Sequence, residues 1–245
     1  MILVKPSFEI MEIMAGSIDG EMYCDEYTSL KLLERVGRVC YKSEDKITEN
    51  SSEKFIKNIL KRGHESVIEH SAIMVKFVCD RGVTHELVRH RLCAFSQEST
   101  RYCNYKGGVT FVIPPWLDWI PEGKRDNWDA YKIFDIACIK GKTVYDEDTY
   151  HEHVREGTLW LVSMKDSEDR YINALDIGWS PQQARSVLPN STKTEIVMTA
   201  NFREWRHIFK LRCSKAAHPQ MREIMIPLLQ ECKGIIPVIF EDINV

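Results

Sequence analysis

Apolar residues recur at helical spacing in two stretches near the start of the chain. Over residues 28–41 they fall three or four positions apart, which predicts an amphipathic helix. A second helix is predicted over residues 52–62, because Asn50 and Glu53 have the spacing of a capping box and Gly63 provides a helix end. His64 is therefore expected just beyond the exit of this helix.

The second half of the chain carries a helix with clear start signals. In residues 180–187, Ser180 is a capping residue, Pro181 takes the first helical position and Gln183 completes a capping box. Residues 201–212 form another helical pattern. Its apolar side consists of Trp205, Ile208, Phe209 and Leu211.

Three further helices are predicted from the same periodicity. One starts near Thr84 and is expected to carry residues 89–91 in its last turn. The others span about 158–174 and 219–232, the last of which we expect to end at Gly234.

Strand patterns are fewer than helical ones. Residues 71–79 are apolar and rich in branched and aromatic side chains, which predicts a largely buried strand, and residues 109–113 predict a second one. Helices interrupted by few strands favour an α+β fold. We expect a single domain over residues 1–245, with a central, mainly antiparallel sheet and helical lobes. Residues 116–156 show no clear period, and an elaborated segment is expected at about 104–160.

Composition excludes several classes of protein. The net charge of −3, from 33 basic and 36 acidic residues, argues against non-specific binding to nucleic acid. The eight cysteines form no Cys-x-x-Cys pair, which favours reduced thiols and a cytoplasmic location. No run approaches the roughly 20 apolar residues of a membrane span, so no membrane partner is expected.

A dense basic segment is the main sign of chemistry. Arg89, His90 and Arg91 are consecutive, and Ser99 and Arg101 come shortly after. Guanidinium groups make planar, two-toothed hydrogen bonds to phosphate, and a hydroxyl adds a donor. Because the interleaved residues include apolar ones, the segment differs from a solvated basic face and predicts a site for a phosphorylated ligand.

Other chemistries fit the sequence less well. His85 and His90 are five residues apart, about 140° around a helix, whereas a shared zinc needs a spacing of four. No catalytic metal is therefore predicted. Ser99 has no Gly-x-Ser-x-Gly elbow, so it is interpreted as a ligand donor and not as a nucleophile. Neither a GxGxxG nor a Walker sequence occurs, so side chains and helix ends must hold any nucleotide.

The basic segment resembles the signature of the flavin-dependent thymidylate synthases: Arg-His-Arg, seven residues, Ser, and Arg two residues on. Three more segments are similar to blocks of that family and occur in the same order. They are His64–His70, Ala184–Pro189 and Asn201–Arg212.

The resemblance implies roles for individual residues. Arg212 corresponds to the catalytic arginine held against the uracil ring of dUMP, whose developing negative charge a permanent cation would stabilise. Implied contacts to the phosphate and sugar are Ser99, Arg101 and Arg185, and further substrate contacts are Glu86, Arg89 and Gln97. The FAD contacts implied are His64, Ser66, Arg89, His90, Arg91, Gln97, Asn201, Arg203 and His207.

Some positions depart from the family pattern. Glu86 stands where many members have glutamine, and His207 where others have asparagine. Residues 217–224 match the family pattern after Arg212 only loosely. Helical spacing would place Arg203 and His207 together, with Asn201 off to one side.

The resemblance also implies the reaction and its partners. The family methylates dUMP to dTMP with 5,10-methylenetetrahydrofolate, with FAD as redox carrier and NADPH as reductant, and its members are homotetramers with shared active sites. It needs no cysteine nucleophile, and no cysteine here has a recognisable activating context. Two other classes stay open: a non-catalytic nucleotide-binding protein and a metal-dependent nucleotide hydrolase.

Overall fold

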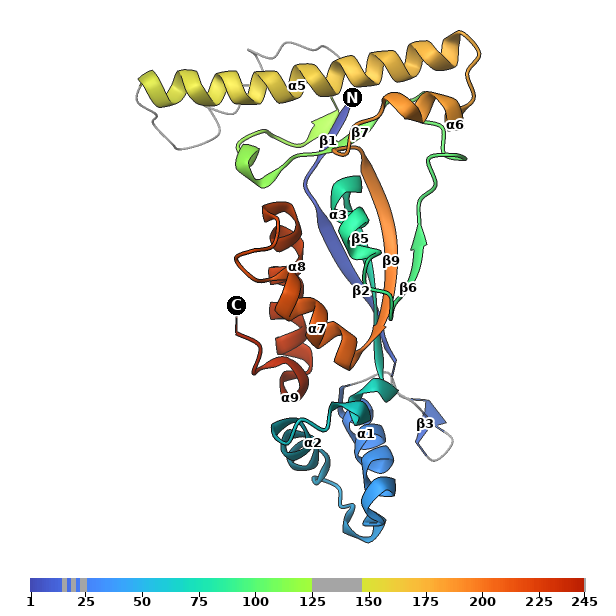
Figure 1. Ribbon diagram of the computed structural model, residues 1–245, viewed down its shortest axis with the longest axis vertical. Coiled ribbons are helices and arrows are strands. Elements are labelled where there is room, and N and C mark those ends of the chain that lie inside the picture. Colours follow the sequence, from blue (N-terminus) through green and yellow to red (C-terminus); the bar gives the residue numbers. More distant parts are fainter. Residues whose placement is uncertain (15–16, 19–20, 23–25, 125–146, 245) are drawn as a thin grey trace. The chain divides into compact units, whose positions relative to one another are not determined.

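A computed structural model describes residues 1–14, 17–18, 21–22, 26–124 and 147–244 (Figure 1). The chain divides into two compact units. Unit 1 consists of Met1–Ser7, Val78–His85 and Gln97–Glu195. Unit 2 consists of Phe8–Phe77, Glu86–Ser96 and Ile196–Val245. The predicted α+β class is confirmed, because helices and antiparallel strands occur without a repeating βαβ pattern.

The described strands form three sheets. A three-stranded sheet has the order β7-β1-β8, a four-stranded sheet the order β2-β5-β9-β6, and β3 pairs with β4. Strand β1 is parallel to β7 and antiparallel to β8. The strands are β1 Ile2–Val4, β2 Ser7–Met14, β3 Ser17–Ile18, β4 Glu21–Met22, β5 Ala72–Asp80, β6 Ala94–Gln97, β7 Thr110–Val112, β8 Gly123–Lys124 and β9 Lys193–Asn201.

Unit 1 is built on the β7-β1-β8 sheet and a long helix. Helix α5 (Glu147–Asp176) packs on α6 (Pro181–Ala184) and on the 3₁₀ helix η4 (Arg185–Val187), and a further 3₁₀ helix, η3, spans Pro115–Leu117. The core between sheet and helix includes Leu3, Phe111, Leu161, Met164 and Tyr171. Ser180 caps α6 as predicted, and its backbone N–H donates to Oε1 of Gln183 at 2.9 Å.

Unit 2 contains most of the helices. Helix α7 packs on α8 and on the 3₁₀ helix η2, while α1 packs on α2. Buried aromatic rings link α7 to the C-terminal region: Phe209 meets Phe240 edge to face at 5.7 Å and stacks on Trp205 at 5.4 Å. The helices are α1 Glu26–Tyr41, η1 Glu44–Lys46, α2 Ser52–Lys61, η2 Glu65–His70, α7 Phe202–Arg212, α8 Pro219–Ile235 and α9 Pro237–Phe240.

The helix after β5 differs from the prediction. Helix α3 spans Arg81–Leu87, so residues 89–91 lie in the turns beyond it and not in its last turn. The reason is the buried carboxylate of Asp80, whose Oδ1 accepts from the backbone N–H of Val83 at 2.7 Å. Asp80 therefore acts as the N-cap and starts the helix directly at the end of the strand.

Capping also differs at α2. The N-cap is Ser51, and neither Asn50 nor Glu53 forms the predicted capping box. The Ser51 hydroxyl instead accepts from the backbone N–H of Thr48 at 2.9 Å and donates to Glu34 at 2.7 Å. The end of the helix is as predicted, because Gly63 has a φ of 72°.

Two smaller predictions, one on burial and one on helix length, are wrong. Leu211 is exposed on α7, although the other predicted core residues of that helix are buried. Helix α8 runs through Gly234 to Ile235, and the backbone N–H of Ile236 donates to the carbonyl of Cys232. The prediction of a largely buried strand over residues 71–79 is confirmed, because buried side chains alternate with half-buried ones in β5 and none is exposed.

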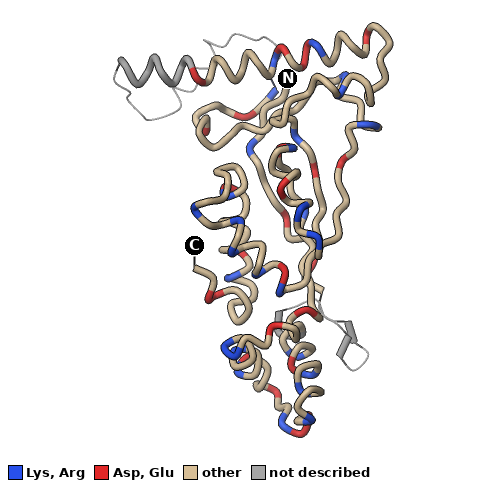
Figure 2. Tube along the Cα trace, viewed as in Figure 1, with Lys and Arg blue, Asp and Glu red and all other residues tan. Residues whose placement is uncertain are grey.

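Charge is spread over both units. Figure 2 shows lysine and arginine interspersed with aspartate and glutamate along the described chain. Within the described residues, no helix combines the length and apolar character needed to cross a lipid bilayer. Residues 125–146, which belong to the segment predicted to be elaborated, lie outside the described residues.

Candidate active site

Arg212 is held in a fixed orientation within unit 2. It lies in the last turn of α7, and its side chain is only 15% exposed. Its Nη1 donates to the Glu86 carboxylate at 2.5 Å, and its Nη2 donates to the Glu86 carbonyl at 3.0 Å. A guanidinium group carries five N–H donors in one plane. Two contacts to one residue therefore fix that plane and leave the remaining donors available.

His90 completes the contacts of Arg212. The Nε of Arg212 donates to Nε2 of His90 at 3.0 Å, and the imidazole is buried. Burial, together with the nearby charges of Arg212 and His207, lowers the pKa of His90 to about 4. The imidazole is therefore neutral at pH 7, as it must be to accept a hydrogen bond from an arginine.

A pocket of about 640 Å³ opens at the start of α7. Asn201, Arg203 and His207, all predicted to contact a flavin, line it together. The expectation that Asn201 lies off to one side is wrong. Asn201 is the N-cap of α7, with Oδ1 accepting from the N–H of Glu204 at 2.8 Å, so its side chain turns back toward the helix it starts. The other lining residues are Glu65, Glu69, Leu92, Glu204, Arg206 and Lys210.

Charges in this pocket are only partly paired. Arg203 contacts Glu69 at 2.5 Å, and this hydrogen bond raises the pKa of the Arg203 guanidinium. Arg206 is buried and forms two hydrogen bonds with Asp242, at 2.6 and 2.7 Å. Among the described residues, His207 and Lys210 form no ion pair, but the ligand atom of His207 lies within 4.8 Å of that of Glu204, and the charge of Lys210 lowers the pKa of Asp242.

The other residues predicted to bind flavin, except Gln97, also belong to unit 2. His64 precedes η2, and its Nδ1 is 2.7 Å from the hydroxyl of Tyr41, whose ring stacks on the imidazole at 6.5 Å. Ser66 lies in η2 and is exposed. Arg89 and Arg91 are exposed on either side of the buried His90, so the three basic residues do not form one continuous face.

The residues predicted to bind the phosphate lie in unit 1. Arg101 donates from Nε to Gln182 at 3.1 Å, and Arg185 donates from Nη1 to Thr100 at 3.1 Å. These two bonds hold residues 99–101 against residues 182–185. The structure thus brings Ser99, Arg101 and Arg185 into one neighbourhood, as predicted, with both arginines exposed.

Gln97 also lies in unit 1. Its Nε2 donates to Thr84 at 3.0 Å and to Thr194 at 3.3 Å. Because both amide protons have partners, the side-chain carbonyl is the group that remains for a ligand. Gln97 can therefore accept a hydrogen bond from a ligand more readily than it can donate one.

Thiol chemistry is disfavoured at four of the cysteines. Burial raises the pKa of Cys79 far above its usual range, that of Cys93 and Cys232 to about 12, and that of Cys213 to about 11. A thiol that stays protonated at pH 7 is a poor nucleophile. Cys24 and Cys138 lie outside the described residues.

One cluster has side chains suited to a metal ion. His90, Glu204 and His207 each offer a ligand atom within 4.8 Å of the others. A ligating imidazole must present a lone pair to the metal. Nδ1 of His90 is the atom that faces Glu204, so a metal bound there would place the imidazole proton on Nε2 and break the contact with Arg212. The absence of a catalytic metal stays a prediction.

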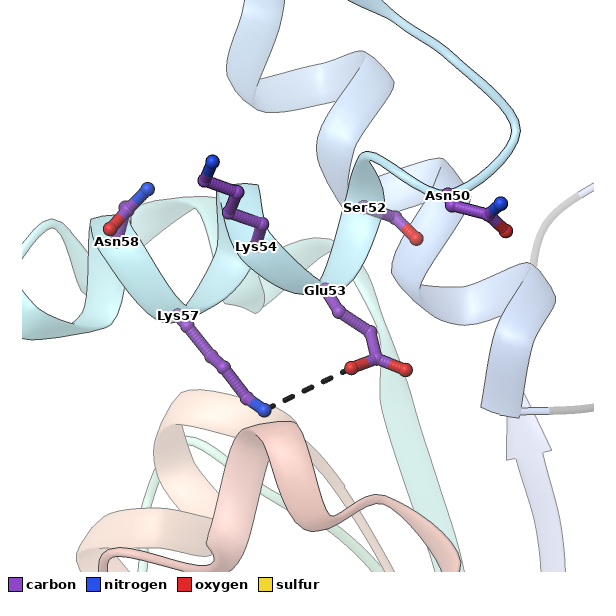
Figure 3. A pocket seen from close by; sticks show the side chains of 6 residues that line it. All are labelled: Asn50, Ser52, Glu53, Lys54, Lys57 and Asn58. Atoms are coloured by element: carbon purple, nitrogen blue, oxygen red, sulfur yellow. Dashed lines mark ion pairs between the residues drawn. The ribbon is translucent and has the colours of Figure 1, made fainter.

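A second pocket, of about 540 Å³, lies beside α2. Its lysines do not converge: Figure 3 shows Lys54 and Lys57 pointing to opposite sides of the helix, with Lys57 directed toward Glu53 at 3.8 Å. Other lining residues are Asn50, Ser52 and Asn58. Diverging cations beside a carboxylate do not make a focused anion site.

Several residues at the site were not predicted from the sequence. They are Tyr41, which contacts His64; Thr100 and Gln182, which hold the arginines of unit 1; and Glu204, which faces His90. Only Glu204 has a local signal, because it lies three residues after the helix-capping Asn201. The other contacts join segments that are distant in sequence.

Comparison with known proteins specifies the family to which the chain belongs. Residues 25–238 match the family model described as thymidylate synthase complementing protein. The chain is 31% identical to the flavin-dependent thymidylate synthase of Mycolicibacterium vanbaalenii over 87% of this chain and 79% of that protein. It is 32% identical to the protein of the same name from Mycobacterium tuberculosis, with the same coverage.

A solved structure shares the fold. The UMP/dUMP methylase PolB from Streptomyces cacaoi, bound with 5-Br dUMP, has a TM-score of 0.69 and 22% identity, over 98% of this chain and 96% of that one. The chain belongs to the family of flavin-dependent thymidylate synthases. The prediction that it is an enzyme of this methyltransferase class is confirmed.

Proposed function

We propose that this protein converts dUMP to dTMP, with 5,10-methylenetetrahydrofolate as one-carbon donor, FAD as redox carrier and NADPH as reductant. The methylene carbon leaves the folate nitrogens and bonds to C5 of uracil, which loses its proton. The two electrons from NADPH reduce that carbon to a methyl group, so tetrahydrofolate and NADP⁺ are the other products. Family membership and the likeness to the PolB methylase support the transfer to a uracil nucleotide.

The observation that carries the proposal is the restraint on Arg212. Three of its N–H groups are fixed by Glu86 and His90, and the remaining two lie in the same plane. A preorganised planar cation stabilises charge that develops on the carbonyl oxygens and N3 of uracil without reorganising during the reaction. Arg212 is accordingly the proposed catalytic residue.

The pocket at the start of α7 is the proposed site for an anionic dinucleotide. Its volume lies in the range of about 300–1,000 Å³ usual for cofactor sites. Arg203, His207 and Lys210 supply positive charge or hydrogen-bond donors, and the exposed Leu92 supplies an apolar surface. We propose that Asn201, Arg203 and His207 hold FAD there, with His64, Ser66 and residues 89–91. When bound, FAD supplies the electrons for reduction.

The arginines of unit 1 suit the phosphate of dUMP. Arg101 and Arg185 each use one N–H group in a contact within the unit and keep the others free. Ser99 adds a hydroxyl close to Arg101 in sequence. We propose that these three residues bind the phosphate and sugar, with Gln97 and Arg89 as further contacts and Glu86 acting beside the uracil.

The proposed reaction does not use a cysteine as nucleophile. Burial keeps the thiols of Cys79, Cys93, Cys213 and Cys232 protonated at pH 7. A route that relies on positioning and charge needs no thiolate. The raised pKa values therefore agree with a flavin-dependent route.

The test is an absorption spectrum and a binding titration of the purified protein. We expect bound or readily acquired FAD, saturable near one flavin per chain, and dTMP formation that a chelator does not reduce. A colourless protein that binds dUMP but takes up no FAD would instead be a non-catalytic nucleotide-binding protein. Loss of activity on chelation would favour a metal-dependent nucleotide hydrolase, for which His90, Glu204 and His207 are the candidate ligands.

We further propose a cytoplasmic homotetramer with shared active sites, formed by a single functional domain over residues 1–245. Candidate residues are divided between two units, and the chain has no glycine-rich element to enclose a dinucleotide. Neighbouring subunits that each contribute a wall would enclose FAD more completely. Mixing inactive His64→Ala and Arg212→Ala proteins should restore part of the activity if the two residues act in different chains. A monomer by light scattering that makes dTMP would contradict this arrangement.

A further inference from the structure

Glu204 is a buried carboxylate to which the proposed reaction gives no role. It is 8% exposed, and its Oε1 lies 3.5 Å from Nδ1 of His90, on the side of the imidazole opposite Arg212. A buried carboxylate is unfavourable unless a donor or a cation compensates it. The imidazole of His90 is the donor within ion-pair distance of this carboxylate among the described residues.

The contact with Arg212 decides where the proton of His90 resides. An arginine can only donate, so Nε2 of His90 must present a lone pair to Nε of Arg212 at 3.0 Å. A neutral imidazole carries a single N–H group, which must then be at Nδ1. Nδ1 is the atom that faces Glu204. The geometry of the three residues is therefore self-consistent in only one tautomer.

We propose that Glu204 is a positioning residue that acts on Arg212 through His90. Its carboxylate accepts from Nδ1 and thereby keeps Nε2 of His90 as an acceptor for Arg212. Glu86 fixes one edge of the guanidinium group, and the Glu204 and His90 pair fixes the other. The inference rests on the proposed function, since it is the catalytic use of Arg212 that gives the arrangement its purpose.

The same contacts argue against a metal at this cluster. Zinc bound between His90, Glu204 and His207 would need the lone pair of Nδ1, which moves the proton of His90 to Nε2. Two N–H groups, on Nε2 and on Arg212, would then face each other at hydrogen-bond distance. The tautomer of His90 therefore distinguishes the two alternatives. A proton on Nδ1 agrees with the positioning role, and a proton on Nε2 agrees with a metal site.

The test begins with the tautomer in the intact protein. Nitrogen-15 NMR of histidine-labelled holoenzyme, assigned with a His90→Gln variant, should show His90 neutral at pH 7 with its proton on Nδ1. A proton on Nε2 would overturn the proposal, and a further shift on addition of Zn²⁺ would overturn it in favour of a metal site. This measurement does not depend on activity. An inactive wild-type enzyme with the expected tautomer would contradict the proposed function and still support the position assigned to the proton.

The second measurement uses Glu204→Gln, which keeps the shape of the side chain. Its amide can donate to Nδ1, so the preference for the Nδ1 proton should be lost. We expect kcat for dTMP formation to fall at least about tenfold, because one oriented hydrogen bond is lost. The KM for dUMP should change less than about threefold, and reduction of FAD by NADPH should remain near normal.

The matched control is Glu53→Gln, which changes an exposed glutamate on α2. It should alter neither the tautomer of His90 nor kcat. If Glu204→Gln retains both the Nδ1 proton and the kcat of the wild type, Glu204 has no positioning role. An equal fall in kcat and in FAD reduction would overturn the proposal in favour of a structural role.

Discussion

Arg212 and His90 are joined by a hydrogen bond of 3.0 Å from Nε to Nε2, although 122 positions separate them in the chain. The donor is a permanent cation, and the acceptor is an imidazole whose pKa is lowered to about 4. The direction of this bond is thus fixed by chemistry, and the guanidinium plane is fixed with it. A group that depends on such a plane should tolerate few replacements.

Arg212→Lys tests this dependence most directly. Lysine keeps the positive charge but loses the fork that contacts Glu86 and His90 together. We expect dTMP formation to fall by about two orders of magnitude, comparable to removal of one oriented donor in a transition state. Reduction of FAD by NADPH without folate should fall far less, since uracil is not involved. Stopped-flow flavin reduction and a dTMP assay compare the two steps, and near-normal dTMP formation would remove Arg212 from the catalytic role.

Glu86 should tolerate an amide but not an apolar residue. Its Oε2 accepts from Arg212, and its backbone carbonyl makes a second contact that no substitution removes. Glu86→Gln retains an acceptor, so we expect kcat/KM for dUMP to change less than about fivefold. Glu86→Leu removes the side-chain acceptor and should reduce kcat/KM by about tenfold or more, because one charge-assisted hydrogen bond is lost. Equal behaviour of the two variants in steady-state assays would show that the carboxyl group does not orient Arg212.

His90 should make stability depend on pH. The folded pKa of about 4 lies below the value of about 6.5 in an unfolded chain. Between these values the unfolded state binds more protons, so stability increases with pH and is lost as pH falls from about 6.5 toward 4. Urea unfolding of the wild type and His90→Gln should therefore show a stability difference that shrinks, by about 1–2 kcal/mol, between pH 7 and pH 5. A constant difference would mean that His90 titrates normally.

Arg101 should contribute to dUMP binding through the phosphate. Removing one charge-assisted contact costs about 1.5–3 kcal/mol, or roughly a ten- to hundredfold weaker Kd. Arg101→Ala should show this loss with dUMP in calorimetry, whereas deoxyuridine, which lacks the phosphate, should bind weakly to both proteins. Arg170→Ala, which removes an exposed arginine paired with Asp166, is the control. Equal losses for both ligands would place Arg101 away from the phosphate.

Local signals in the sequence predicted the α6 region well. Ser180, Pro181 and Gln183 are close neighbours, so the cap they form depends on little else in the fold. The start of the helix after β5 was predicted incorrectly, because the residue that caps it could not be recognised from the sequence. The pattern Asp80-Arg81-Gly82 is typical of a turn, and only the three-dimensional structure shows that Asp80 is the cap of α3.

The site could be predicted only as a set of residue types. Sequence spacing grouped Arg203 with His207, and resemblance added Arg212, but neither indicated that Glu204 faces His90. That contact joins a helix to a turn more than one hundred positions earlier, and such pairs are set by tertiary packing. The Arg101–Gln182 and Arg185–Thr100 contacts have the same origin.

Helix α7 limits how this family member can be altered. A single stretch, Phe202–Arg212, carries the pocket residues at its start and Arg212 at its end, and Asn201 fixes where its first turn begins. Each residue added to a helix rotates the residues beyond it by about 100° and advances them about 1.5 Å. An insertion of one residue near the middle of α7 would thus turn Arg212 away from His90 while leaving Asn201 and Arg203 in place. Both the length and the phase of this helix are therefore constrained, so insertions within it should be far less tolerated than substitutions.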